Sequence, residues 1–153
     1  MKDFKQLPLV SIITPCFNSE KYVDRYLESV LKQTYKNIQQ IIVNDGSIDN
    51  TEKIVLSYVD KFKKQGMQLT YLKKENGGIG SAINAGLKLV KGEYFCWCDS
   101  DNMYLPDYVI KNANFLTEHT DFSVVRCDGY YVEESNIDKY IGTMCSSEHD
   151  KTD

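Results

Sequence analysis

The stretch LVSIITPCFN, residues 9–18, predicts a buried strand followed by a turn. Its first six residues are mostly apolar and rich in β-branched side chains, which is typical of a strand covered on both faces. Pro15 has no N–H to donate to a central ladder, so we expect the strand to end there. Apolar residues then recur at helical spacing as far as Leu31, with Asn18 or Ser19 as the expected helix cap.

The same alternation of apolar runs and helical patterns continues outward along the chain. Further strands are expected at residues 40–43, 69–72 and 94–98, with helices after residues 47, 80 and 106. Strands that alternate with helices through short links favour an α/β fold, a doubly wound and mostly parallel sheet flanked by helices. In such sheets, ligands bind outside the carboxyl ends of the strands.

The late part of the chain is less regular. A further strand is expected over residues 122–127, and residues 129–132 extend it after a bend. We therefore expect a single domain over residues 1–153, with its core in residues 8–132 and an irregular tail over residues 133–153.

Composition excludes several classes of function. The 153 residues are 42% hydrophobic and 26% charged, with a formal net charge of -4, which argues against nucleic acid as a partner. The five cysteines are odd in number, which indicates free thiols in a reducing compartment. No apolar run approaches the roughly 18 residues of a membrane span, and residues 1–9 lack a signal-peptide core. The chain is expected in the cytoplasm, and peripheral association with the inner face of the membrane stays open.

Polar residues follow three of the expected strands, at residues 15–18, 44–47 and 99–102. Asp99 and Asp101 lie two apart in extended backbone, about 6.5 Å from each other on one face. Their mutual repulsion is about 2 to 3 kcal/mol at an effective dielectric near 20, and a divalent cation would remove it. A solvated turn is the alternative for this pair alone. The convergence of three polar strand ends favours a metal-assisted phosphate site.

Two other motifs have open interpretations. Asp45 could accept a hydrogen bond from a ring N–H of a pyrimidine base, or it could only cap a helix or shape a turn. The loop from Asn76 through Gly77 and Gly78 to Gly80 lets main chain approach a ligand and take positive φ. It matches neither the Walker loop nor the dinucleotide fingerprint.

Taken in order, these segments resemble the family-2 glycosyltransferases, which have the nucleotide-sugar-binding fold called GT-A. The resemblance covers about residues 8 to 120, and so many ordered motifs make it specific. It is carried by the stretches PLVSIITPCFN (8–18), YV (22–23), SVLKQT (29–34), VNDGSID (43–49), NGG (76–78), NAG (84–86), GEY (92–94), DSD (99–101) and LP (105–106).

The resemblance implies a role for most of the candidate residues. The loop of Pro15, Cys16, Phe17 and Asn18 would cradle the nucleoside, and Asp45 would bind the base. Asp99 would contact the ribose or the metal shell, and Asp101 would bind Mn²⁺ or Mg²⁺ at the diphosphate. The remaining nucleotide-binding candidates are Asn76, Gly77, Gly78 and Ser100. The resemblance further implies an inverting enzyme that transfers a sugar, expected to be UDP-linked, to a glycan, lipid carrier or polysaccharide precursor.

The sequence departs from the family pattern at Asn44, Ile83 and Asn102, which stand where Asp, Arg and Asp are common. The catalytic base of such enzymes is expected beyond Asp153, in an acceptor-binding half that we expect to be absent here. Asp128, at the end of an expected strand, is the candidate base within these residues. Two other functions stay open, a sugar nucleotidyltransferase and a non-catalytic nucleotide-sugar-binding module of a larger assembly. The first normally has a Gly-rich loop with a basic residue after its first strand, which residues 15–18 do not supply.

Overall fold

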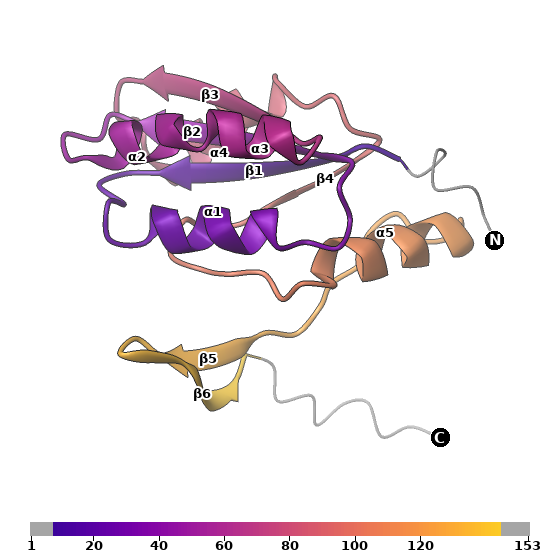
Figure 1. Cartoon of the computed structure of the whole chain (residues 1–153). Coiled ribbons are helices and arrows are strands. Elements are labelled where there is room, and N and C mark those ends of the chain that lie inside the picture. The colour runs from indigo at the N-terminus through magenta and orange to yellow at the C-terminus, as the bar shows by residue number, and fades with distance from the viewer. Residues whose placement is uncertain (1–7, 145–153) are drawn as a thin grey trace.

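The computed structural model describes residues 8–144. Four parallel strands form one sheet in the order β3-β2-β1-β4 (Figure 1). They are β1 (Val10–Cys16), β2 (Ile38–Asp45), β3 (Gln68–Lys74) and β4 (Tyr94–Trp97). The predicted α/β fold with a parallel sheet is therefore confirmed. Because β2 and β4 lie on opposite sides of β1, the strand order reverses at β1, where α/β folds place their ligands.

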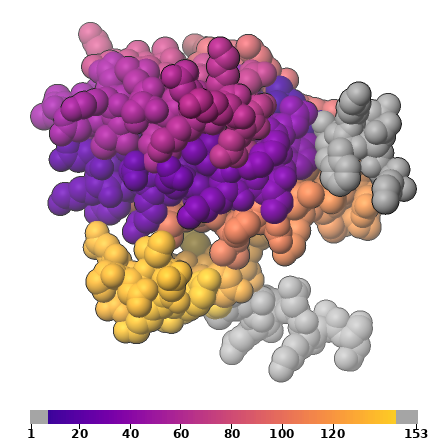
Figure 2. All heavy atoms as spheres, viewed as in Figure 1, coloured from indigo at the N-terminus to yellow at the C-terminus, as the bar shows by residue number. Residues whose placement is uncertain are grey.

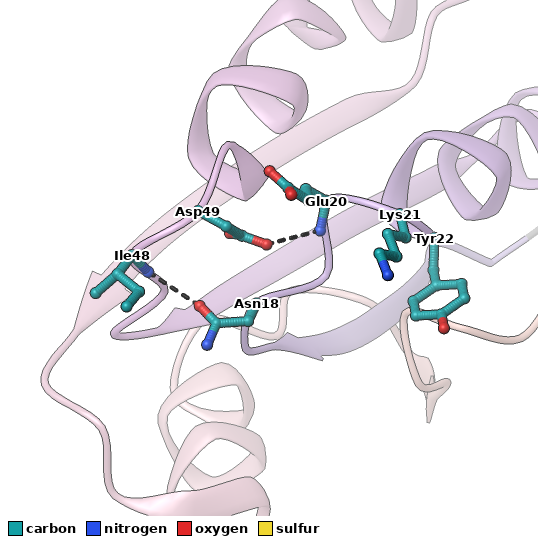
Figure 3. Close-up of a pocket in the computed structure, with 6 residues that line it drawn as sticks. All are labelled: Asn18, Glu20, Lys21, Tyr22, Ile48 and Asp49. Carbon is teal, nitrogen blue, oxygen red and sulfur yellow. Dashed lines mark hydrogen bonds between the residues drawn. The ribbon is translucent and has the colours of Figure 1, made fainter.

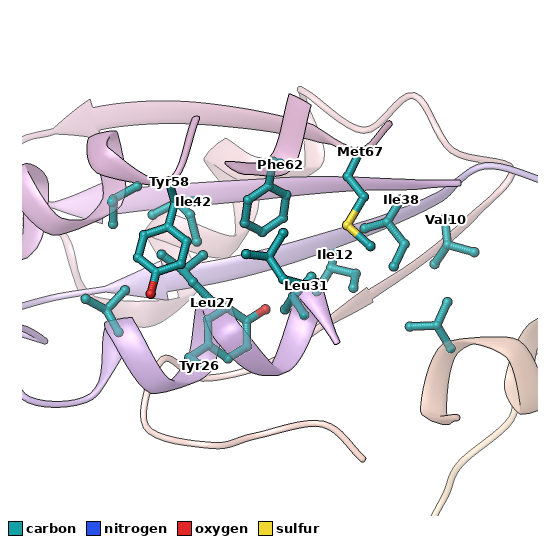
Figure 4. Packing of buried hydrophobic residues seen from close by; sticks show 14 of the residues in the cluster. Val10, Ile12, Tyr26, Leu27, Leu31, Ile38, Ile42, Tyr58, Phe62 and Met67 are labelled. Atoms are coloured by element: carbon teal, nitrogen blue, oxygen red, sulfur yellow. The ribbon is translucent and has the colours of Figure 1, made fainter. Parts of the chain in front are cut away.

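Helices cover both faces of this sheet. They are α1 (Val23–Leu31), α2 (Thr51–Ser57), α3 (Val59–Lys64), α4 (Gly78–Leu87) and α5 (Tyr108–Glu118). The larger core joins Ile12 and Ile42 of the sheet to Tyr26 of α1, Tyr58 and Phe62 (Figure 4). A smaller core lies on the opposite face, where Ala82 of α4 packs against the three sheet residues Ile13, Ile41 and Val43.

Strand β1 runs through Pro15, which corrects the prediction that the strand ends there. Pro15 pairs in register with Val43 of β2, and the strand continues to Cys16. The main-chain carbonyls of Leu9 and Ile13 accept hydrogen bonds from the N–H groups of Tyr94 and Cys98. The main-chain N–H and C=O groups of the odd-numbered residues of β1 therefore point toward β4. The main-chain nitrogen of Pro15 points toward the same side, but the last residue of β1 that pairs with β4 is Ile13. The missing N–H therefore points where no ladder remains, and it costs no hydrogen bond.

The expected cap of α1 is also wrong. The helix begins at Val23 after Tyr22, whose side chain makes no cap hydrogen bond. Asn18 instead accepts from the main-chain N–H of Ile48 through its side-chain oxygen, and the main-chain N–H of Ser19 donates to Thr51. Asn18 thus binds the loop after β2 and Ser19 binds the first residue of α2, while the turn at residues 20–22 separates both from α1.

The late segment differs most from expectation. Residues 124–129 join no ladder, so the strand expected over 122–127 does not form. Strand β5 (Tyr130–Glu133) forms close to residues 129–132, where a strand was expected after a bend. It pairs antiparallel with β6 (Asn136–Thr143) in a hairpin, and β6 lies where an irregular tail was expected. The residues of β6 are all exposed. A strand with neither face buried needs no alternation of apolar and polar residues, which is the signal by which a half-buried strand is predicted. The hairpin forms a separate lobe beside the main body (Figure 2). The rest of the expected tail, with Cys145, lies outside the described residues.

The packing of α4 on the sheet depends on Gly86. A Cβ atom built on Gly86 would lie 2.5 Å from Cγ2 of Ile13 and 3.3 Å from Cγ2 of Val43, whereas one on Gly80 of the same helix would meet nothing. We expect Gly86→Ala to lower the free energy of unfolding by about 1 to 3 kcal/mol, the usual cost of overpacking. Gly80→Ala should raise it by about 0.5 to 1 kcal/mol through helix propensity. Urea unfolding of both variants measures this, and equal stabilities would contradict the packing argument.

Candidate functional site

The loops that follow β1 and β2 are joined by hydrogen bonds between side chains and main chain. The N–H of Asn18 donates to Oγ of Ser47 at 3.0 Å, and the N–H of Ile48 donates back to Oδ1 of Asn18 at 3.0 Å. The N–H of Glu20 donates to Oδ2 of Asp49 at 3.0 Å (Figure 3). Each bond fixes main chain of one loop to a side chain, so the two polar strand ends form one unit.

The third polar strand end joins the same unit. Oγ of Ser100 donates to Oγ of Ser19 at 2.8 Å, and both side chains are buried. The N–H of Cys98 donates to the carbonyl of Ile13 at 3.0 Å, just beyond the last paired residue of β4. The structure therefore brings together the three strand ends that the sequence singles out.

Within the loop after β1, the side chains differ in what they present to a ligand. Cys16 is buried in the larger core, and burial raises the pKa of its thiol to about 12, so only its main chain is available. Phe17 is half exposed. Asn18 has a φ of 49°, in the left-handed region that Asn tolerates better than most residues. The loop thus offers main-chain groups, one exposed aromatic ring and an amide already bonded to Ile48.

Asp45 lies at the end of β2, almost fully covered, and accepts hydrogen bonds from three donors, because the N–H of Gly77 is shared between its two oxygens. Its Oδ1 accepts from Nζ of Lys74 at 2.5 Å and from the N–H of Gly77 at 3.1 Å. Its Oδ2 accepts from the N–H of Gly77 at 3.1 Å and from that of Gly78 at 2.8 Å. Gly77 and Gly78, which were predicted for the site, therefore bind Asp45, which was predicted for it as well.

Glycine is required where this loop meets β2. Gly46 has a φ of +81°, and a Cβ atom there would lie 2.9 Å from the main-chain nitrogen of Asn76. The close approach places the loop from Asn76 to Gly78 directly over the end of β2. Helix α4 begins at Gly78, so Asp45 also fixes the start of this helix.

The charge of Asp45 is stabilised inside the protein. Burial acts to raise the pKa of Asp45, but the donors Lys74, Gly77 and Gly78 outweigh it, so the pKa lies below its ordinary value. The carboxylate is therefore ionised at neutral pH, even though only 4% of its side chain is exposed. Lys74 supplies the compensating positive charge.

Asp99 and Asp101 are exposed, in contrast to Asp45. Partial burial and the neighbouring charge of Asp101 raise the pKa of Asp99 above its ordinary value. Nη2 of Arg25, on α1, donates to the main-chain carbonyl of Asp101 at 3.3 Å, which ties the loop to the helix. Residues 99–102 form a turn in which the N–H of Asn102 donates to the carbonyl of Asp99 at 3.2 Å, so the expectation of extended backbone is wrong. Both acids are exposed in this turn, and the charge of Asp101 disfavours that of Asp99.

These two acids could hold a cation only together with a ligand. Across residues 8–144, no group of three or more His, Cys, Asp or Glu side chains could hold a metal ion. Mg²⁺ and Mn²⁺ are commonly held by one or two carboxylates together with substrate phosphates and water. The donor set of Asp99 and Asp101 fits a cation that arrives with a diphosphate.

An open hollow of about 600 Å³ lies on the outer side of the joined loops (Figure 3). Of the predicted site residues, only Asn18 lines it. The other lining residues are Glu20, Lys21, Tyr22, Ile48 and Asp49. The hollow therefore adjoins the loops after β1 and β2, and none of the predicted site acids Asp45, Asp99 and Asp101 lines it.

Asp128, the candidate base, lies outside the three polar strand ends. Asp128 is exposed in the segment before β5, and residues 124–129 form no strand, so the strand end that made Asp128 a candidate base does not form. The contacts of Lys74 were not predicted from the sequence, and Asp49 was expected only as a candidate cap of the helix after β2 and as the last residue of the VNDGSID stretch. The signal for Asp49 is its place in the DGSID stretch, whereas nothing local distinguishes Lys74 from Lys73.

Most of this chain, including the three polar strand ends, matches a known protein family. Residues 11–151 match the family model described as Glycosyl transferase family 2. An uncharacterized glycosyltransferase of Rickettsia typhi is 46% identical over 130 residues, which are 85% of this chain and 39% of that protein. The chain thus spans well under half the length of this relative.

Solved structures share the fold. TarS of S. aureus in complex with UDP-GlcNAc is 34% identical, with a TM-score of 0.65 over 72% of this chain and 32% of that one. The mannosyltransferase PcManGT from Pyrobaculum calidifontis, in complex with GDP-Man and Mn²⁺, has a TM-score of 0.67 at 23% identity. The match covers 74% of this chain and 34% of the mannosyltransferase, and it shows a shared fold.

The bonds between the two loops make Asp49 important for stability. Burial acts to raise the pKa of Asp49, but hydrogen bonds from Thr51 and the N–H of Glu20 outweigh it, and the pKa lies below the ordinary 3.8. This contribution is present above the unfolded-state pKa and is lost as the pH falls through the lower folded-state value. We expect Asp49→Ala to cost about 1 kcal/mol of unfolding free energy at neutral pH, as loss of a helix cap does.

Urea unfolding at about pH 7 and about pH 3 measures both effects. The difference between Asp49→Ala and wild type should shrink at the acid pH. Asp121→Ala, which removes an exposed acid beyond α5, is the control and should leave stability nearly unchanged. A loss for Asp49→Ala that is equally large at both pH values would contradict the role of the charge.

Proposed function

The chain belongs to glycosyl transferase family 2, and we propose that it forms the donor-binding part of an inverting glycosyltransferase that takes a nucleotide-diphosphate sugar. The observation that carries the proposal is the junction of the three polar strand ends through Asn18, Ser47, Ser19 and Ser100. TarS, a relative by structure and at 34% identity, binds UDP-GlcNAc. UDP is therefore the expected nucleotide.

The nucleoside is proposed to lie along the loop of residues 15–18, with its base toward Asp45. Main-chain groups of this loop are fixed by their bonds to the loop after β2, so they can orient a ligand without first becoming ordered. The loop from Asn76 to Gly78 closes the same end of β2. Such preorganisation favours one position of the sugar for in-line attack.

Asp99 and Asp101 are proposed to hold Mn²⁺ or Mg²⁺ at the diphosphate. When bound, the cation supplies Lewis-acid stabilisation of the departing diphosphate. The two acids suit this role because both are exposed and the charge of one disfavours the charge of the other. Ser100 lies between them with its side chain turned inward to Ser19, which holds the acid loop against β1.

The proposal extends to the acceptor and the catalytic base. We propose a glycan, a lipid carrier or a polysaccharide precursor as the acceptor, with the base outside residues 8–144 and Asp128 as the candidate inside them. In the described part of the chain, no helix is both long enough and apolar enough to cross a membrane. We propose that the enzyme works in the cytoplasm, where a lipid-linked acceptor would bring it to the inner face of the membrane.

A panel of nucleotides tests the proposal directly. A ligand that binds the folded state stabilises it by RT ln(1 + [L]/Kd), so its thermal unfolding temperature rises. We expect UDP and UDP-sugars to raise the unfolding temperature more with Mn²⁺ than with EDTA, and UMP to have a smaller effect. A flat response to UDP, GDP and their sugars, with and without Mn²⁺, would overturn the proposal.

Removal of one acid tests the metal site. We expect Asp101→Ala to abolish the part of UDP affinity that depends on Mn²⁺ and to leave the unfolding free energy within about 0.5 kcal/mol of wild type, since the side chain is exposed. Titration calorimetry with UDP in Mn²⁺ and in EDTA measures the dependence. Asp60→Ala, an exposed acid on α3, is the matched control. Equal metal dependence in Asp101→Ala and wild type would place the cation elsewhere.

A further inference from the structure

Lys74 lies directly across from Asp45 in the sheet. The two residues are register partners in the parallel pair of β2 and β3, and both side chains point to the face that α4 covers. Nζ of Lys74 contacts Oδ1 of Asp45 at 2.5 Å, with 24% of the lysine side chain exposed and 4% of the aspartate. Gly77 makes room for this contact, because a Cβ atom there would lie 3.0 Å from Nζ of Lys74.

Three donors surround the carboxylate of Asp45. Nζ of Lys74 binds Oδ1, the N–H of Gly78 binds Oδ2, and the single N–H of Gly77 is shared between the two oxygens. A carboxylate offers about four acceptor positions, but only 4% of the Asp45 side chain is exposed. We therefore expect a base N–H to reach Asp45 only when one of these donors moves aside.

The three donors differ in how easily they can leave. The N–H groups of Gly77 and Gly78 belong to the main chain at the start of α4, over a close contact between Gly46 and Asn76. Lys74 instead ends the edge strand β3, and its ammonium is carried on a flexible side chain. Its Nζ also donates to the main-chain carbonyl of Glu75, so part of its hydrogen bonding survives a small movement.

We propose that Lys74 competes with the base of the donor nucleotide for Asp45, so that this lysine sets the affinity of the site for bases that carry a ring N–H. The inference rests on the proposed function, since it takes the nucleotide site at the end of β2 as given. In the free protein, Lys74 neutralises the covered carboxylate. In the complex, the ring N–H takes the position on Oδ1 and the ammonium turns toward Glu75 and solvent.

Exchange of Lys74 for Met tests the competition, because Met keeps the length of the side chain and removes the ammonium. We expect Lys74→Met to bind UDP about three- to tenfold more tightly, the range of a partly exposed ion pair that no longer has to be broken. 3-Methyluridine diphosphate has no ring N–H to offer, so its affinity should not rise. Titration calorimetry of the whole chain with both nucleotides, in Mn²⁺, gives the two ratios.

Lys73→Met is the matched control. Lys73 precedes Lys74 on the same strand, points to the opposite face and pairs with Glu52, with both side chains well exposed. This variant should bind UDP as wild type does. A gain in Lys73→Met equal to that in Lys74→Met would show that a general change of charge, rather than competition for Asp45, is responsible.

Other outcomes overturn the inference in distinguishable ways. Unchanged or weaker UDP binding by Lys74→Met would do so, as would an equal gain for 3-methyluridine diphosphate. Amide hydrogen exchange at Gly77 and Gly78 in the free variant then gives the reason, since faster exchange would assign Lys74 to holding the glycine loop. If wild type binds no nucleotide at all, the proposed function fails, whereas binding by wild type with no gain in Lys74→Met rejects the competition alone.

Discussion

Strand β1 is buried on both faces and paired on both edges, so each polar group on it must find its partner inside the protein. Oγ of Ser11 donates to Oε1 of Gln39 at 2.6 Å on the face toward α4 and accepts from the N–H of Gly92 at 2.9 Å. On the other face, Oγ1 of Thr14 donates to the hydroxyl of Tyr26 at 2.6 Å. These bonds are satisfied in one alignment of β1 with β2, α1 and the turn before β4. The alignment in turn fixes which strand ends meet at the site.

The acid loop after β4 is held from the core as well as from the other loops. The segment that follows Asp101 binds two buried polar residues, Ser29 on α1 and Gln33 just beyond the helix. The N–H of Tyr104 donates to Oγ of Ser29 at 3.1 Å. Gln33 donates to the carbonyl of Leu105 at 2.8 Å and accepts from the N–H of Val109 at 3.1 Å. A buried amide that bridges two elements is costly to disrupt. Asp99 and Asp101 therefore lie on a short exposed loop with both ends fixed, which suits a ligand that must meet them in one position.

The acids of the site have opposite electrostatic environments. Asp45 is covered, and its charge is balanced by Lys74 and by main-chain N–H groups, so its pKa is lowered. Asp99 has Asp101 as its charged neighbour, and its pKa is raised by partial burial and by that charge. The first arrangement is complete without a ligand, whereas the second is relieved only by a cation or a proton. In the proposed function, the metal and the diphosphate bind at the acid loop, whereas at Asp45 the base would have to displace a donor that is already bound.

The sequence by itself determined the parallel α/β fold and the three polar strand ends, because apolar runs, helical spacing and turn residues are local signals. It could not show that β1 passes through Pro15, since that depends on where the ladder to β4 stops. Nor could it separate Lys74 from Lys73. The pairing of β2 with β3 decides this, because side chains alternate between faces and a shift of one residue would place Lys73 beside Asp45. Register is a property of two strands together, so only the tertiary structure decided which lysine neutralises the acid at the site.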